Sequence, residues 1–178
     1  MQNADIYQKL RLAGLPVPVV AKTTLPDSGF PALRKIIADK EFVTEDGPAC
    51  YVLYAGDKLN STLTRVALAA ALMGKELTIS GVRVRYSSLS NLIRWSGEKR
   101  FDDDCPFVSG NGYIIIPDFD DTASITTQAD WRCALDLLTH HVSWGGGLIL
   151  GKGQTDIDFP GSNFDVLYRN FETLLINR

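Results

Sequence analysis

Apolar and polar residues follow two different patterns on either side of residue 50. Before it, apolar side chains recur near helical spacing over residues 4–13 and again over 29–39, with a proline-rich connector between them. After it, short and continuously apolar runs alternate with longer amphipathic segments, which is typical of buried strands separated by helices. The pattern therefore predicts a helical N-terminal extension over residues 1–44 and an α/β domain over residues 45–178.

The second region predicts parallel strands joined by helices. Strands are expected at residues 50–55, 77–79, 82–86, 113–116, 148–150 and, near the end of the chain, in the segment FETLLIN. Helices are expected from Ser61 to Met73, where Gly74 ends the segment, from a cap at Ser87 or Ser88 through Trp95, and over residues 128–142. Because a helix separates most successive strands, parallel pairing with right-handed crossovers follows. The expected fold class is α/β, with a three-layer, open and mostly parallel sheet.

Composition narrows the class of protein without indicating a function. The 178 residues carry a net charge of −3 and have a pI near 5.3, so only a local patch would attract nucleic acid or an anionic membrane. No stretch has the roughly 20 apolar residues of a membrane span, and the N-terminus is too polar for a signal peptide. Cys50, Cys105 and Cys133 form no CxxC pair, which argues against zinc and a disulfide framework and for a reducing, cytoplasmic compartment.

The turn after the first strand begins like the nucleotide-binding turn of an ATPase. The strand leads into Gly56, a polar loop follows, and a helix of small residues opens at Ser61 and Thr62. In a phosphate-binding loop, glycines bring backbone N–H groups close to the phosphates, a lysine spans the β and γ phosphates, and Ser or Thr holds Mg²⁺. Here no lysine precedes Thr62, and Lys58 lies too early in the loop for that place. A plain strand-to-helix turn capped by Asn60 or Ser61 is the alternative.

The order of these features is similar to the ATPase domain of DnaC/IstB-type AAA+ proteins, the helicase loaders and their transposition relatives. The similarity covers about residues 45–176, with an N-terminal "YQKLRLAGLP" ahead of it, and rests on the strand and loop at 51–62, "VRYSSLSNLI", a strand ending in Asp118, and "GGGLILGKG". In that family the corresponding strand ends in an acid that holds Mg²⁺, and the next residue is an acid that polarises the attacking water. Asp118 matches the first acid. Phe119 takes the place of the second acid, and Gly151-Lys152-Gly153 replaces the polar pair of the sensor position.

The resemblance implies a degenerate P-loop NTPase-like core that works without catalysis. No catalytic residue, metal or cofactor is expected. The residues of the vestigial nucleotide site would be Gly56, Lys58, Ser61, Thr62 and Asp118. The implied partner is a replicative DNA helicase of the DnaB type, loaded or redirected at an origin by a protein of phage or mobile-element origin.

The N-terminal region is the expected contact with that helicase. It stands ahead of the α/β core, and its first segment has apolar side chains that would dock as an amphipathic helix. These side chains are Ile6, Tyr7, Leu10 and Leu12.

Two other functions are compatible with the sequence. A divergent Mg²⁺-dependent ATPase would use Lys58 or Lys152 together with Thr62 and Asp118. A single-stranded-DNA-binding accessory protein would use a basic patch that includes Arg83, Arg85 and Arg94, with Trp95 and Phe101 as stacking rings. A charged outer face with aromatic residues turned into the core is the alternative to this patch.

Three further groups of residues have structural interpretations. Asp102, Asp103 and Asp104, with Asp118, Asp120 and Asp121, suit a solvated acidic turn better than a two-metal site. His140 and His141 lie at the C-terminal end of a predicted helix, where the helix dipole favours positive charge. Trp144, beside three glycines, is either an anchor for a partner or a lid on the core.

Overall fold

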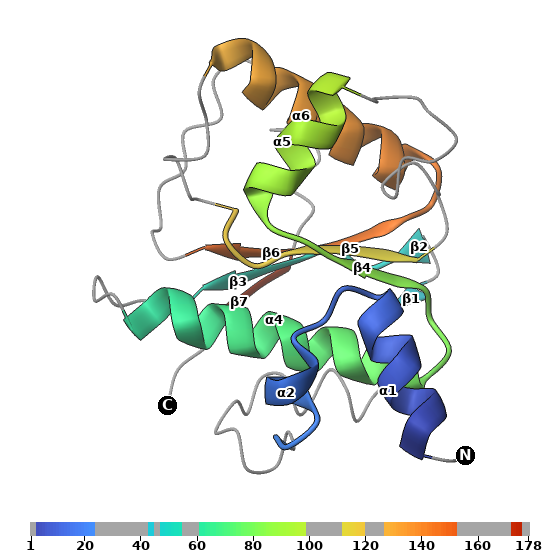
Figure 1. Cartoon of the computed structure of the whole chain (residues 1–178). Coiled ribbons are helices and arrows are strands. Elements are labelled where there is room, and N and C mark those ends of the chain that lie inside the picture. The colour runs from blue at the N-terminus through green and yellow to red at the C-terminus, as the bar shows by residue number, and fades with distance from the viewer. Residues whose placement is uncertain are drawn as a thin grey trace.

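The computed structural model describes residues 3–23, 43–44, 47–54, 61–98, 112–119, 127–152 and 172–175. These residues form three layers, in which a parallel sheet lies between helices on both of its faces (Figure 1). The helices are α1 (Asn3–Leu12), α2 (Val17–Val20), α4 (Ser61–Ile79), α5 (Leu89–Glu98) and α6 (Gln128–Ser143). The sheet contains β3 (Tyr51–Tyr54), β4 (Val84–Tyr86), β5 (Tyr113–Ile116), β6 (Gly147–Lys152) and β7 (Glu172–Leu175), while β1 (Val43–Thr44) and β2 (Gly47–Pro48) form a separate antiparallel pair. The helix predicted over residues 29–39 lies outside the described residues.

The five-stranded sheet is parallel throughout, in the order β4-β5-β6-β3-β7. The chain passes from β3 through α4 to the far edge at β4, and then returns one strand at a time through α5 to β5 and through α6 to β6. Right-handed crossovers that run in opposite directions place their helices on opposite faces. Consequently α4 covers one face together with α1 and α2, whereas α5 and α6 cover the other (Figure 1). The predicted α/β class and open parallel sheet are confirmed.

The central strands are buried on both faces, as their continuously apolar sequences predict. Tyr113 and Ile115 of β5 belong to the hydrophobic cluster on the α4 side, while Ile114 and Ile116 belong to the cluster on the α6 side. The predicted apolar face of α6 is buried against this second side. The alternation of side chains along β5 therefore joins two cores through one strand.

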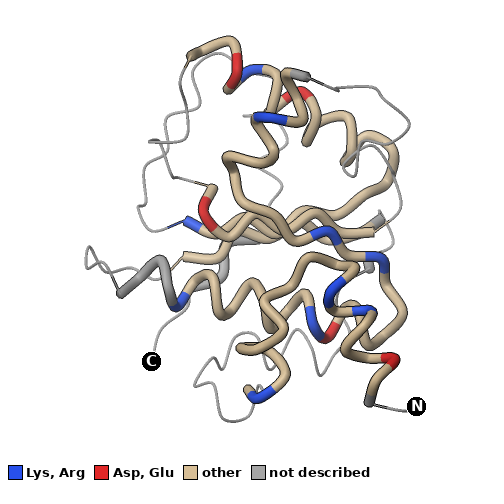
Figure 2. The backbone as a smooth tube through the Cα atoms, in the orientation of Figure 1, with Lys and Arg blue, Asp and Glu red and all other residues tan. Residues whose placement is uncertain are grey.

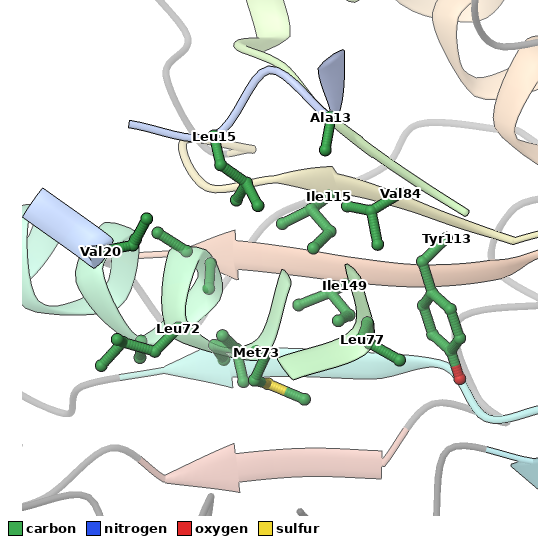
Figure 3. Close-up of a cluster of buried hydrophobic side chains, with 14 of the residues drawn as sticks. Ala13, Leu15, Val20, Leu72, Met73, Leu77, Val84, Tyr113, Ile115 and Ile149 are labelled. Carbon is green, nitrogen blue, oxygen red and sulfur yellow. The ribbon is translucent and has the colours of Figure 1, made fainter. Parts of the chain in front are cut away.

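The N-terminal helices share a core with the sheet. Ala13, Leu15 and Val20 lie in one buried cluster with side chains of α4, β4, β5 and β6 (Figure 3). The backbone N–H of Tyr86 donates to the Ala13 carbonyl at 2.7 Å, which fixes the end of α1 against β4. The domain boundary predicted at residue 44 therefore does not separate two hydrophobic cores within the described part of the chain.

Helix α4 is longer than the sequence predicts. It continues past Gly74 and through residues 77–79, so the short strand expected there is wrong. Leu77 is fully buried and continues the apolar face of the helix, which outweighs the β-propensity of the segment. The helix ends at Ile79. Gly81 follows with a φ of +85°, and a hydrogen bond from the Val82 N–H to the Leu77 carbonyl completes a Schellman motif.

Candidate functional site

The carboxyl ends of the parallel strands meet at one edge of the sheet, which we call the carboxyl edge. Tyr54 ends β3, Asp118 follows β5, and Lys152 ends β6 in register with Tyr54. The connection after β3 leads to α4 on one face and that after β5 leads to α6 on the other. Ligands of open α/β sheets bind where successive connections diverge in this way. The carboxyl edge along β3, β6 and β5 is therefore the candidate site.

The predicted nucleotide residues lie at this edge as far as the structure describes them. Ser61 and Thr62 form the first turn of α4, whose backbone N–H groups have no partners within the helix. Asp118 follows the strand next to the one that ends in Lys152. Gly56 and Lys58 lie outside the described residues.

Asp118 is hydrogen-bonded to the helix that precedes its own strand. Its Oδ1 atom accepts a hydrogen bond from the backbone N–H of Leu89, the first residue of α5, over 2.8 Å. A carboxylate here satisfies an N–H that the helix leaves without a partner, and the positive end of the helix dipole favours its charge. Ser88, one of the two predicted caps, accepts a second bond from the N–H of Asn91 at 3.3 Å. Asp118 and Ser88 together stabilise the start of α5.

Asp118 also acts electrostatically on Tyr86 at the end of β4. Burial, and to a smaller extent the negative charge of Asp118, raises the pKa of Tyr86 to about 12. The Tyr86 hydroxyl donates to the Ala67 carbonyl of α4 over 3.5 Å. Tyr86 therefore stays neutral over the physiological pH range and connects the sheet to α4.

Phe119 stands where the resemblance places the second acid of an ATP-hydrolysing site. Its side chain is only 1% exposed, and its ring centroid lies 5.4 Å from that of Trp131 on α6. Its backbone N–H donates to the Gly151 carbonyl at 2.8 Å, which joins the turn after β5 to β6. The residue therefore belongs to the α6 core and brings no ionisable group to the carboxyl edge.

Gly151 allows the ends of β5 and β6 to approach each other closely. A Cβ atom at this position would overlap the Pro117 carbonyl oxygen and lie 2.6 Å from Cγ1 of Val66 on α4. The sequence shows Gly151 only as a departure from a polar sensor pair. The structure shows a steric reason for glycine, since any side chain would separate the strand end from α4.

Lys152 brings a cation to the carboxyl edge, where it is only 7% exposed. Strand β6 lies between β5 and β3, so its end stands between Asp118 and the strand that leads to α4. A buried ammonium group needs polar or charged partners to offset the hydration that it loses. A buried lysine at a point where strand connections diverge is a candidate ligand for phosphate.

The basic residues predicted to contact nucleic acid lie on two elements. Arg83 and Arg85 alternate with Val84 and Tyr86, which pack on the α4 side, so both arginines lie on the other face of β4. Burial and the neighbouring charge of Arg83 lower the pKa of Arg85. Arg94 is exposed on α5. The structure thus brings Arg83 and Arg85 together and places Arg94 on another element.

The N-terminal helix does not present all four side chains that were predicted to dock on a partner. Leu10 is 1% exposed within the core, and Ile6 packs against the same core. Leu10 is therefore not available for docking, because the amphipathic pattern of α1 reflects its packing on α4 of the same chain. Tyr7 and Leu12 are exposed, at 47% and 68%.

The other residues considered for metal binding or catalysis have structural explanations where the structure describes them. Within the described ranges, no three side chains of metal-binding type lie close enough to hold an ion, and residues 102–104, 120 and 121 fall outside those ranges. His141 is buried, with Nε2 3.2 Å from the Gly147 carbonyl oxygen, and so joins the end of α6 to the start of β6. Burial raises the pKa of Cys50, which disfavours the thiolate that a nucleophile would need.

Comparison with known proteins assigns no family: no protein-family model matches the chain, and no curated protein matches it significantly. Membership of the DnaC/IstB-like family therefore stays a prediction. Among the helices that the structure describes, none has both the length and the apolar character needed to cross a bilayer.

Proposed function

We propose that this protein is a non-catalytic, helicase-loader-like accessory protein of DNA replication. In this proposal, an AAA+-like P-loop scaffold with degenerate nucleotide motifs binds a replicative DNA helicase of the DnaB type, and a phage or mobile element encodes it. The observation that carries the proposal is the set of contacts that Asp118 and Phe119 make. The family resemblance expects acids of an ATP-hydrolysing site at these two positions, whereas Asp118 caps a helix and Phe119 belongs to the hydrophobic core.

The chemistry of ATP hydrolysis explains why these contacts matter. Hydrolysis at a P-loop needs a ligand for Mg²⁺, a group that positions water and a lysine on the β and γ phosphates. One carboxylate oxygen of Asp118 accepts a hydrogen bond from the Leu89 N–H, Phe119 is apolar, and the residue before Thr62 is a serine instead of a lysine. Loss of the lysine's charge-assisted contact alone costs about 1.5–3 kcal/mol of phosphate binding. A scaffold kept without these groups is suited to recognition rather than turnover.

The arrangement of β3 and α4 supports a P-loop-like scaffold. A buried strand inside the sheet is followed, after a polar stretch of sequence that contains Gly56, by the N-terminus of a long helix. This is the arrangement in which P-loops hold phosphates. Without turnover, any switch between states would draw on binding energy or on the nucleotide cycle of the helicase itself.

The surface proposed to contact the helicase is the exposed side of α1. Tyr7 and Leu12 are large apolar side chains in solvent, and they flank the exposed side of a helix whose buried face packs on the core. Exposed apolar side chains on a fixed helix suit a partner that offers a hydrophobic groove. Leu10, which was predicted to belong to this surface, has no part in it.

Capture of the replicative helicase tests the proposal. The purified full chain and the DnaB-type helicase of the native host are expected to elute together in size-exclusion chromatography. The double variant Tyr7→Asp/Leu12→Asp should lose the complex, while Val19→Asp, which alters an exposed apolar residue of α2, should keep it. Failure of the wild-type chain to bind the helicase would refute the proposed partner, and binding by the double variant would refute the proposed surface.

A second candidate function, a divergent Mg²⁺-dependent ATPase, is favoured by one observation. Lys152 is buried at the end of β6 beside β3, where it would supply the cation that the loop lacks. Calorimetry with ATP and Mg²⁺ separates the candidates. The ATPase requires micromolar binding and phosphate release, both lost in Lys152→Met, whereas the non-catalytic proposal expects neither in the wild-type chain.

A further inference from the structure

The edge where the strands begin, which we call the amino edge, joins segments that are distant in sequence. The N–H of Gly147 donates to the Gly112 carbonyl at 2.9 Å, and the N–H of Tyr113 donates to the Arg83 carbonyl at 2.8 Å. The turn after α6 and the residue before β4 therefore stand on either side of the start of β5, about 10 Å apart at the usual strand spacing. Figure 1 shows the end of α6 and the starts of β4, β5 and β6 on this side of the molecule.

Trp144 is a large aromatic side chain at this edge and is 68% exposed, whereas Tyr113 at the start of β5 is buried. It follows the last residue of α6 and precedes Gly145, whose φ of +83° turns the chain toward β6. Its ring centroid lies 5.5 Å from that of His140, so the indole has a neighbour on the helix but no cover from the core. The interpretation of Trp144 as a lid on the core is therefore wrong. An exposed indole on a defined turn is a stacking surface.

Positive charge accompanies this ring. Arg83 is exposed and Arg85 is half-buried on the same face of β4, close enough for the charge of Arg83 to act on Arg85. No carboxylate within the described ranges forms an ion pair with either arginine. The ion pair found in those ranges joins Lys9 to Asp5 at 3.2 Å. Two like charges on one strand face repel each other. An anion bound between them would relieve that repulsion.

Helix α1 extends the positive charge around the edge of β4. The hydrogen bond between Tyr86 and Ala13 fixes the C-terminal end of α1 beside the end of β4, and Arg11, two residues earlier, is exposed. Figure 2 shows basic positions of α1 and of β4 on the same side of the molecule. Because the whole chain carries a net charge of −3, this attraction for anions is local.

We propose that the amino edge binds single-stranded nucleic acid, with the Trp144 indole stacked on a base and the guanidinium groups of Arg83 and Arg85 on backbone phosphates. A ring stacks only on an unpaired base, which favours a single strand. The starts of β4 and β6 are about 10 Å apart, a distance that about three stacked nucleotides span. The aromatic partner differs from the sequence prediction, since Trp95 is half-buried against the α6 core and Phe101 lies outside the described residues. The surface is at the opposite edge from the candidate nucleotide site and does not depend on helicase binding.

Fluorescence anisotropy of a labelled oligothymidylate of about 15 nucleotides tests this surface in the full-length protein. We expect binding that weakens with added salt. The Arg83→Ala/Arg85→Ala variant should weaken it and reduce the slope of log K against log salt by about 1.4, the value for two lost phosphate contacts. Trp144→Ala should weaken it by about 5- to 150-fold, the range for one stacked base, while Trp144→Phe should retain most of the affinity.

Arg94→Ala and Arg132→Ala, which remove exposed charges from α5 and α6, are the matched controls and should leave the affinity unchanged. Each altered side chain is exposed or half-buried, and circular dichroism spectra should confirm that every variant folds. The proposal is overturned if the wild-type chain does not bind the oligonucleotide. It is also overturned if the Arg83→Ala/Arg85→Ala and Trp144→Ala variants bind like the wild type, or if duplex DNA of the same length binds as tightly as the single strand.

Discussion

The carboxylate of Asp118 accepts a hydrogen bond from the backbone N–H of Leu89 at 2.8 Å and so connects the end of β5 to the start of α5. The two residues are 29 positions apart in the sequence. The bond gives a structural role to the side chain that the family resemblance predicts as a Mg²⁺ ligand. Substitutions at this contact and its neighbours, and unfolding at alkaline pH, test that role and the packing around it.

Replacement of Asp118 by alanine should destabilise the fold by about 0.5–2 kcal/mol, the usual cost of losing a helix cap. Urea unfolding measures the change in the free energy of unfolding. Asp118→Asn keeps a side-chain oxygen as acceptor and should lose less. Equal stability of the alanine variant and the wild type would contradict the capping role.

Phe119→Ala should cost about 3–5 kcal/mol, because the ring is fully buried against Trp131. Phe119→Glu restores an acid to the position at which the family resemblance expects one. It should unfold the chain at a lower denaturant concentration than Phe119→Ala, since it buries a carboxylate in an apolar core. A folded, ATP-hydrolysing Phe119→Glu variant would show that the position faces a working site.

Two glycine-to-alanine substitutions should have opposite effects. Gly151→Ala forces a Cβ atom into the Pro117 carbonyl and Val66 and should destabilise by about 1–3 kcal/mol. Gly97 lies in α5, where an added Cβ atom would meet no described atom within 4 Å, so Gly97→Ala should stabilise by up to about 1 kcal/mol. Thermal unfolding of the two variants side by side distinguishes these effects. A neutral Gly151→Ala variant would argue against the close approach of the strand ends.

Stability should fall at alkaline pH in part because of Tyr86, whose pKa is raised to about 12. Its ordinary value is 10.0, so the unfolded chain releases this proton first as the pH rises. The stabilisation is fully present below pH 10 and is lost progressively between about pH 10 and 12. Urea midpoints measured from pH 8 to 11 should decline less steeply in Tyr86→Phe. The same decline in both proteins would assign the effect to other groups, such as Tyr113, whose pKa burial also raises.

The order of helices and parallel strands was predictable because its signals are local. Continuously apolar runs such as residues 113–116 mark strands that are covered on both faces, and helical periodicity over residues 128–142 marks α6. The end of α4 was not predictable in the same way. Gly74 and the β-branched residues near Ile79 indicated a break, whereas the burial of Leu77 against the sheet prolonged the helix.

By itself, the sequence determined the α/β class, the absence of an acid at Phe119 and the position of Asp118 after a buried strand. Only the tertiary structure decided what these residues touch, because Leu89, Gly151 and Trp131 are far from them along the chain. It also decided that Leu10 faces inward while Leu12 and Trp144 face solvent. Periodicity shows that a helix has an apolar face, but only packing determines whether that face is covered by the same chain or left for a partner.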